Sequence, residues 1–189
     1  YNGRVDLFYG SPGGLNYSSA WSWSPNTTDD WWMGVALTSA DFNRDGFDDL
    51  VTGSGYPKRL YTFFGAPSGF QAAGYELDTR EWWGSAAGAS GDLDGDGFPD
   101  LTVTRGNASY GRLGIGRGGA GAPTATEVTE LTAPSLAGWV LSGVDFNRDG
   151  FGDVVASSFH TPSPWPTLAG WLGLWWGGTA RGTQPVSTS

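Results

Sequence analysis

Residues 41–49 read D-F-N-R-D-G-F-D-D, and the same pattern returns as D-L-D-G-D-G-F-P-D at 92–100 and D-F-N-R-D-G-F-G-D at 145–153. Each segment has oxygen-bearing side chains at positions 1, 3, 5 and 9 and a glycine at position 6. Calcium takes six to eight oxygen ligands at roughly 2.3–2.6 Å, and alternate residues of a tight loop can supply them. The sixth-position glycines are expected to have a positive φ, which a residue with a Cβ resists. The sequence therefore predicts three calcium sites.

The first loop offers five oxygen-bearing ligand groups. They are the side chains of Asp41, Asn43, Asp45 and Asp49 and the main-chain carbonyl of Phe47. An EF-hand begins similarly, but it needs Glu at position 12 and flanking helices. Position 12 is Thr52, Val103 or Ala156 here, and short β-branched runs follow each ninth residue, so each loop is predicted to join two strands. A metal-free surface turn is the alternative, and the recurrence of one ligand order in three copies favours the metal.

The three loops recur after 51 and 53 residues, a period typical of repeat architectures. A strand-like segment of small residues precedes each loop, and a later strand ends in glycine. The preceding segments cover 34–40, 84–91 and 138–144, and the glycine-ended strands cover 60–65, 113–118 and 172–177. Polar runs such as 69–79 and 122–131 complete the units. About four short strands in roughly 50 residues are typical of one β-propeller blade.

We therefore expect an all-β fold of four-stranded antiparallel blades, with about three and a half repeats in a single domain. The full repeats are predicted at about 25–79, 80–131 and 132–180. Residues 1–24 correspond to the second half of a repeat, and residues 181–189 correspond to a polar strand that would lead into another unit. Closed propellers usually have four to eight blades. The chain is thus expected to be the remainder of a longer propeller or a protomer of a homo-oligomer.

The loops, together with F-Y-G-S-P-G-G-L at 8–15 and F-F-G-A-P-S-G-F at 63–70, resemble the FG-GAP repeat of integrin α-subunit-type propellers and their bacterial secreted relatives. The resemblance covers nearly the whole chain and implies one calcium ion in each loop. One unit departs from the pattern, because Gly116 and Arg117 replace the aromatic pair found at 8–9, 63–64 and 175–176. The ligands that the resemblance implies in the later loops are Asp92, Asp94, Asp96, Asp100 and the Phe98 carbonyl, and Asp145, Asn147, Asp149, Asp153 and the Phe151 carbonyl.

Composition agrees with a secreted all-β protein. The 189 residues include 32 Gly and 11 Pro, which interrupt helices, and no apolar run approaches the ~20 residues of a membrane span. Cysteine is absent, so bound metal and not a disulfide is available to stabilise the fold. The net charge is −9, and ten of the 19 acidic side chains are predicted calcium ligands. The ten Lys and Arg are scattered, which argues against nucleic acid as a partner.

Eleven tryptophans suggest either dense packing or a ligand surface. Trp21 and Trp23 are two residues apart and would share one face of a strand. Trp165 lies between prolines in T-P-S-P-W-P, where a buried strand is disfavoured. Such rings either fill the space between blades or form a platform on which sugar rings stack. Trp21, Trp23 and Trp165 are therefore candidate ligand-binding residues.

The sequence predicts no catalytic residue and no enzymatic activity. His160 is the single histidine and lies in a loop without a recognisable partner motif. The expected function is that of a calcium-binding propeller, secreted or at the cell surface, which serves adhesion, assembly or the binding of a glycan or protein. The alternative is an accessory or catalytic propeller of a secreted polysaccharide-degrading enzyme. A basic residue near free carboxylates in a cleft would favour the enzyme, and an aromatic platform would favour the binding module.

Overall fold

The computed structural model of the chain describes residues 3–25, 32–55, 59–71, 75–78, 87–107, 110–123, 131–133, 140–158, 171–178 and 185–188. Strands and turns make up this described part, which contains no helix, and every strand pair in it is antiparallel. The predicted all-β fold is confirmed. A helix long and apolar enough to cross a membrane does not occur among these residues.

The N-terminal unit is a two-stranded sheet of β1 (Val5–Leu7) and β4 (Trp21–Trp23). Between these strands, β2 (Gly10–Ser11) and β3 (Gly14–Leu15) form a short hairpin. The unit occupies the segment in which the sequence predicts half of a repeat. Its two strands correspond to the outer half of a blade, because β1 aligns with the third strand of the next unit.

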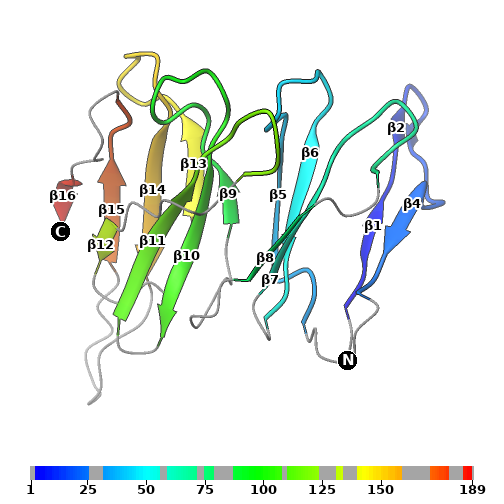
Figure 1. Cartoon of the computed structure of the whole chain (residues 1–189), viewed down its shortest axis with the longest axis horizontal. Helices are drawn as coiled ribbons and strands as arrows, with labels where there is room; N and C mark the ends of the chain where they lie inside the picture. Colours follow the sequence, from blue (N-terminus) through cyan, green and yellow to red (C-terminus); the bar gives the residue numbers. More distant parts are fainter. Residues whose placement is uncertain are drawn as a thin grey trace.

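Three four-stranded sheets follow, and within each sheet consecutive strands pair (Figure 1). The first sheet contains β5 (Ala36–Ala40), β6 (Asp49–Gly53), β7 (Arg59–Phe63) and β8 (Tyr75–Asp78). The second contains β9 (Ala87–Ala89), β10 (Leu101–Asn107), β11 (Tyr110–Gly116) and β12 (Leu131–Ala133). The third contains β13 (Val140–Val144), β14 (Asp153–Ser158), β15 (Trp171–Trp175) and β16 (Pro185–Thr188). Each sheet is a meander of the kind that forms a propeller blade.

The C-terminal strand is the outer strand of the third blade. The sequence assigns residues 181–189 to a polar strand, and β16 within this segment pairs with β15. The register shifts between Leu174 and Trp175, so the pairing is irregular. An unpaired β15 edge would leave main-chain N–H and C=O groups without partners, and the next extended segment satisfies them. The third blade therefore extends beyond residue 180.

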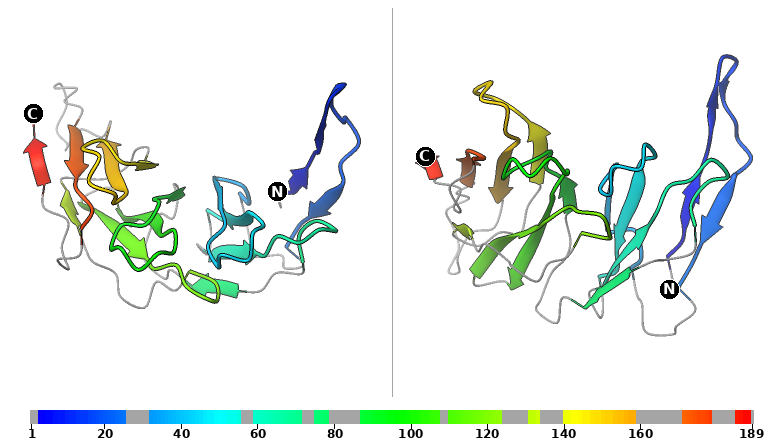
Figure 2. Two further views of the ribbon diagram at one scale, coloured as in Figure 1. Left: turned by 90° about the horizontal axis from the view of Figure 1, so that it is seen from above. Right: turned by 45° about the horizontal axis from the view of Figure 1, so that its top comes forward.

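The blades pack face to face in a curved row, with the N-terminal sheet and the third blade at opposite ends (Figure 2). Adjacent strand residues point to opposite faces, so Leu50 packs toward the N-terminal sheet and Val51 toward the second blade. The cluster on the N-terminal side contains Val5, Met33, Leu50, Tyr61 and Phe63. The cluster between the first two blades contains Phe42, Val51, Leu60, Leu101 and Val103. Fully burying one such side chain contributes about 1.5–3 kcal/mol, so packing between neighbouring sheets stabilises the row.

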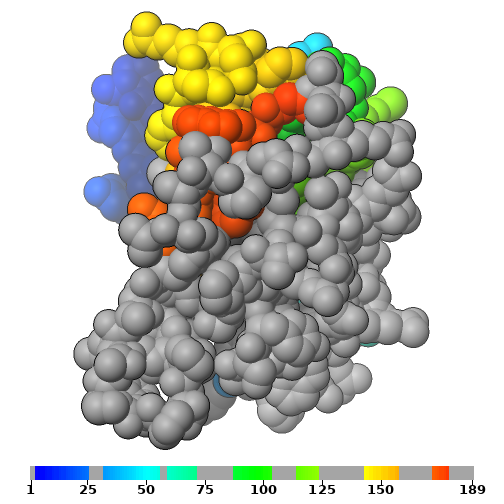
Figure 3. Space-filling model, turned by 90° about the vertical axis from the view of Figure 1, so that its left-hand side faces the viewer, coloured from blue at the N-terminus to red at the C-terminus, as the bar shows by residue number. Residues whose placement is uncertain are grey.

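The end of the row formed by the third blade exposes apolar side chains (Figure 3 views the molecule from this end). Phe146 and Leu172 are 47% and 55% exposed. Their counterparts in the first blade, Phe42 and Leu60, are 0% and 3% exposed because the second blade covers them. The third blade thus presents a face of the kind that is buried between blades elsewhere in the chain.

Candidate metal centre

All three nine-residue loops lie along one edge of the row of blades, at the top of Figure 1. We call residues 41–49 loop 1, residues 92–100 loop 2 and residues 145–153 loop 3. Each connects the first strand of a blade to the second, and the ninth residue lies at or just before the start of that second strand. Because the blades share one topology, they bring their loops to the same edge.

The first aspartate of each loop shapes the turn by accepting two main-chain N–H groups. In loop 1, the carboxylate oxygens of Asp41 accept hydrogen bonds from the N–H groups of Asp45 (3.0 Å) and Gly46 (2.9 Å). In loop 3 the equivalent donors to Asp145 are Asp149 (3.1 Å) and Gly150 (2.9 Å). In loop 2 the donors to Asp92 are the sixth residue Gly97 (2.8 Å) and the fourth residue Gly95 (2.7 Å). The sixth-position glycines have φ values of 92°, 96° and 93°, which confirms the predicted conformation.

The ninth aspartate is the buried anchor of each loop. Asp49, Asp100 and Asp153 have 0% exposed surface. Both carboxylate oxygens accept a main-chain N–H, one from the second residue of the same loop and one from a glycine that follows the third strand. The donors are Phe42 (3.0 Å) and Gly65 (2.9 Å) for Asp49, Leu93 (2.9 Å) and Gly118 (3.0 Å) for Asp100, and Phe146 (2.7 Å) and Gly177 (3.1 Å) for Asp153. The ninth aspartate therefore ties its loop to the third strand, a role that sequence reasoning did not assign.

The donor glycines are sterically required. A Cβ at each would overlap the main-chain carbonyl oxygen of the eighth residue of the same loop. The glycine–carbonyl pairs are Gly65 with Asp48, Gly118 with Pro99, and Gly177 with Gly152. The sequence contains these glycines, but they follow the ninth aspartate by 16, 18 and 24 residues. This variable spacing hides the pairing from sequence analysis.

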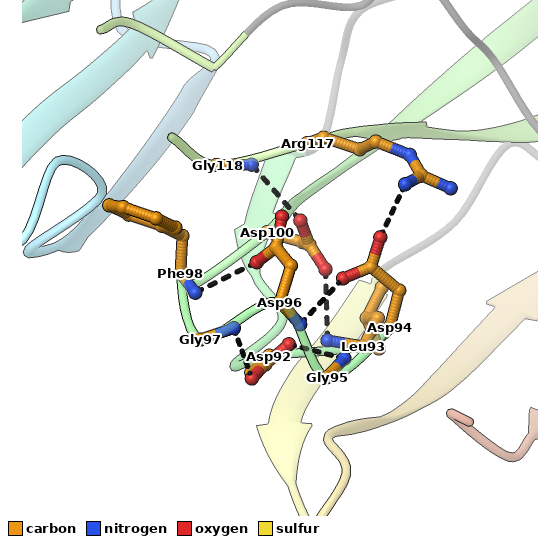
Figure 4. Close-up of polar contacts among 10 residues, drawn as sticks. All are labelled: Asp92, Leu93, Asp94, Gly95, Asp96, Gly97, Phe98, Asp100, Arg117 and Gly118. Atoms are coloured by element: carbon orange, nitrogen blue, oxygen red, sulfur yellow. Dashed lines mark hydrogen bonds and ion pairs between the residues drawn. The ribbon is translucent and has the colours of Figure 1, made fainter. Parts of the chain in front are cut away.

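Loop 2 brings three of its four predicted carboxylate ligands together (Figure 4). One oxygen each from Asp92, Asp94 and Asp100 lies within 4.8 Å of the others. Ligands on opposite sides of a calcium ion are roughly 4.6–5.2 Å apart when each bond is roughly 2.3–2.6 Å. The donor set and its spacing therefore fit one calcium ion. Asp96 is outside this group, and its Oδ1 accepts the N–H of Phe98 at 2.9 Å.

The anchor carboxylates of loops 1 and 2 are costly to ionise. Burial raises the pKa of Asp100 from 3.8 to about 6, although the N–H groups of Gly118 and Leu93 act in the opposite direction. The nearby carboxylates of Asp94 and Asp96 also raise this pKa, because like charges repel. Burial likewise raises the pKa of Asp49. A cation beside these groups would stabilise their ionised forms.

Loops 1 and 2 each accept a main-chain hydrogen bond from the next blade. The N–H of Gly119 donates to the carbonyl of Phe42 at 3.2 Å, and the equivalent N–H of Gly178 donates to the carbonyl of Leu93 at 2.8 Å. The guanidinium of Arg44 in loop 1 also lies 5.7 Å from the centre of the Phe98 ring in loop 2, within the range of a cation–π interaction. The loops therefore hold fixed positions relative to one another.

Trp21 and Trp23 pack between the N-terminal sheet and the first blade. The ring of Trp21 lies 5.0 Å from Phe63 and 5.2 Å from Phe70, and the ring of Trp23 lies 4.9 Å from both Tyr61 and Phe63. Such aromatic pairs contribute about 0.5–1.5 kcal/mol beyond their burial. Both tryptophans remain half-buried, so these contacts account for their packing, while ligand binding by them stays a prediction.

Trp165 and the seventh-position carbonyls remain sequence-based predictions. Trp165 and His160 lie outside the described residues. The carbonyls of Phe47, Phe98 and Phe151 remain predicted ligands. The N–H groups of these three residues donate to the fifth-position aspartate of their own loop at 2.9, 2.9 and 3.0 Å. These bonds fix the main chain at the seventh position without testing the carbonyls as ligands.

The chain is similar to a known repeat family and to several known proteins. The family model for the FG-GAP-like repeat matches residues 41–103 and 92–156. Among similar proteins is the phosphatidylinositol-glycan-specific phospholipase D of Homo sapiens, which is 30% identical over 159 residues. The Bos taurus protein of the same name is 31% identical over 160 residues. Each alignment covers 69% of this chain and 19% of the relative, so the chain spans about a fifth of the length of these curated relatives.

The two family matches together cover more than half of the chain and include all three loops. They also agree with the observed antiparallel blades. The chain therefore belongs to the FG-GAP-like repeat family.

Proposed function

We propose that this protein is a calcium-binding propeller module that acts outside the cytoplasm, without catalytic activity, in adhesion, assembly or the binding of a glycan or protein. The observation that carries the calcium assignment is the grouping of Asp92, Asp94 and Asp100 within 4.8 Å. Loops 1 and 3 share with loop 2 the hydrogen bond from the sixth-position glycine to the first aspartate and the hydrogen bond from the second residue to the anchor aspartate, which supports three sites. Extracellular calcium-binding modules work at roughly 10⁻⁴–10⁻³ M calcium, and exposed loops of this kind suit that range.

The residues of each loop are arranged for a structural site. The first aspartate is held in place by the main-chain turn that it also shapes, and the ninth is held by two strands of the blade. Calcium, when bound, supplies the positive charge that offsets the clustered carboxylates. The carboxylate oxygens of the first and ninth positions already accept main-chain N–H groups, which favours stabilisation of the blade over acid–base catalysis.

Metal analysis of the purified protein tests the calcium assignment. We expect close to three calcium ions per chain after equilibration in calcium buffer and gel filtration. Replacing the predicted ligand Asp45 (Asp45→Ala) should remove about one ion. Asp48 is an acidic residue of the same loop but not a predicted ligand, so Asp48→Ala should leave the content unchanged. A content near zero in the unmodified protein would refute the proposal.

A second candidate function follows from the named relatives. The similarity to phosphatidylinositol-glycan-specific phospholipase D over 69% of the chain favours a module that recognises a phosphatidylinositol glycan as part of a larger enzyme. A glycan array that includes glycosylphosphatidylinositol glycans and neutral polysaccharides separates the two candidates. Binding confined to the inositol glycans would favour the enzyme module, and binding to other glycans would favour the adhesion module.

The exposed end of the third blade supports assembly with a further blade, either from another copy or from the remainder of a longer propeller. Sedimentation velocity in calcium should show self-association of this 189-residue chain. Phe146→Ser should weaken that association, because it places a hydroxyl in the proposed contact. Tyr17 is 89% exposed and lies in the N-terminal unit, so Tyr17→Ser serves as the control. A monomer at all concentrations would contradict assembly between copies.

A further inference from the structure

The three repeats can be compared at two positions, one within each loop and one next to the glycine that donates to its anchor aspartate. The third loop residue is Asn43 in loop 1, Asp94 in loop 2 and Asn147 in loop 3. The residue immediately before the glycine that donates to the anchor aspartate is Phe64, Arg117 and Trp176 in the same order. The second repeat is therefore charged at both positions, whereas the other two repeats have an amide and an aromatic ring.

One atom of the third residue has the same role in every loop. Its Oδ1 accepts the main-chain N–H of the fifth residue, at 2.9 Å in loop 1 and 3.1 Å in loops 2 and 3. The position of this side chain is thus set by the turn and does not depend on whether it is Asn or Asp. The difference between the repeats lies in the second polar atom.

That second atom meets different partners in the three loops. In loops 1 and 3, the amide Nδ2 of the asparagine donates to Oδ2 of the fifth-position aspartate, at 3.0 Å for Asp45 and 2.8 Å for Asp149. Asp94 in loop 2 has a carboxylate oxygen at this place, and a carboxylate cannot donate. Its Oδ2 instead lies 2.5 Å from Nη1 of Arg117 (Figure 4).

The exchange gives the ligand positions and the position of Arg117 the same summed charge in all three repeats. Loop 2 has four carboxylates at its ligand positions, and loops 1 and 3 have three each. The guanidinium of Arg117 offsets the extra carboxylate, and it is charged at every pH at which the protein folds. The side chain of Arg117 is 36% exposed, so it can move away from Asp94 without opening the core.

We propose that the guanidinium of Arg117 binds Asp94 when no metal is present and competes with calcium for this carboxylate. This competition lowers the calcium affinity of loop 2. The inference rests on the proposed calcium function. Asp94 belongs to the group of three carboxylates that fits one ion, so calcium and the guanidinium act on the same ligand. Repulsion between a guanidinium and a divalent ion about 5 Å apart in a water-like dielectric corresponds to roughly a tenfold change in affinity.

The test is a calcium titration followed by NMR on the full chain labelled with ¹⁵N. The amides of Gly46, Gly97 and Gly150 each donate to the first aspartate of their own loop, so their shifts report the three loops separately. In Arg117→Phe, which introduces the aromatic type found at position 64, we expect the Gly97 midpoint to fall about tenfold in calcium concentration. The midpoints of the other two glycines should move less than about twofold.

Two further variants control for charge and for folding. Arg4 pairs with Asp6 in the N-terminal unit, so Arg4→Phe makes the same change in net charge away from loop 2 and should leave all three midpoints within about twofold. The double variant Asp94→Asn/Arg117→Phe reproduces the residue types of loops 1 and 3. Its Gly97 midpoint should lie within about threefold of the other two, which keeps the proposal testable if Arg117→Phe alone folds poorly.

The outcomes separate this inference from the proposed function. An unchanged or higher Gly97 midpoint in Arg117→Phe, with normal responses of Gly46 and Gly150, would overturn the role of Arg117 and leave the calcium proposal intact. A Gly97 amide that never responds while the other two do would also overturn it, because the guanidinium would then replace calcium and not compete with it. If no loop responded to calcium, the proposed function itself would fail.

Discussion

In excess EGTA at neutral pH, the protein is expected to melt about 15–30 °C below its melting temperature in calcium. A ligand that binds the native state alone at a hundredfold excess over its Kd contributes about 2.7 kcal/mol to the free energy of unfolding. Three independent sites would therefore contribute about 8 kcal/mol. For a chain of this size, 1 kcal/mol shifts the melting temperature by about 2–4 °C. Circular dichroism melts with calcium, with EGTA, and with EGTA followed by calcium measure the effect and its reversibility.

Magnesium is the appropriate control for this experiment. It requires near-ideal octahedral geometry at shorter distances and gives up its water reluctantly, so it should restore little of the lost stability. Full restoration by magnesium would indicate general charge screening and not a calcium site. Identical melts with and without EGTA would show that packing between the blades holds the loops without metal.

Melts at different pH values provide a further test, because lowering the pH should change the stability in opposite directions with and without calcium. In the metal-free protein, burial raises the pKa of Asp100 from 3.8 to about 6. The folded state therefore binds more protons than the unfolded state in this window, and stability falls as pH rises through it, by about 3 kcal/mol in total. Lowering the pH from 7 to 5 should thus stabilise the protein in EGTA. In calcium the same change should destabilise it, because protonated carboxylates lose the metal.

The loops were the part of the site most accessible to sequence reasoning. Nine consecutive residues contain every predicted side-chain ligand of a loop, so the ligand order can be recognised locally. The sixth-position glycines predicted the positive φ that the structure shows. The strands on either side of each loop could also be predicted from the sequence. Each loop must connect two strands, and the small-residue run before it and the β-branched run after it supplied them.

The remaining features depend on partners distant in sequence. The bond from Gly118 to Asp100 spans 18 residues and its equivalent in the third blade spans 24, so no fixed spacing marks it. The pairing of β16 with β15 is made by main-chain groups at an open strand edge, so the side-chain pattern does not predict it. Arg117 was visible as a departure from the aromatic pattern, but its contact with Asp94 required the folded blade.

Replacing Gly118 with alanine is expected to destabilise the protein by about 2–6 kcal/mol in calcium. The added Cβ would overlap the carbonyl oxygen of Pro99 and crowd the Cβ of Phe98 at 2.8 Å. Main chain cannot rotate away as a flexible side chain can, so β11 and loop 2 must separate. Such overpacking costs about 1–3 kcal/mol. The separation also weakens the hydrogen bond from the N–H of Gly118 to buried Asp100, which adds about 1–3 kcal/mol.

Gly121 provides the matched control, because a Cβ there would meet nothing within 4 Å. Gly121→Ala should therefore change the free energy of unfolding by less than about 0.5 kcal/mol. Urea melts of both variants measure the difference, and a calcium titration of Gly118→Ala should show weaker binding at loop 2, because Asp100 is one of its three clustered carboxylates. Equal stability of the two alanine variants would mean that the eighth-position carbonyl moves freely. In that case the glycine after the third strand would not be what holds the anchor aspartate, and the loop would owe its position to the metal.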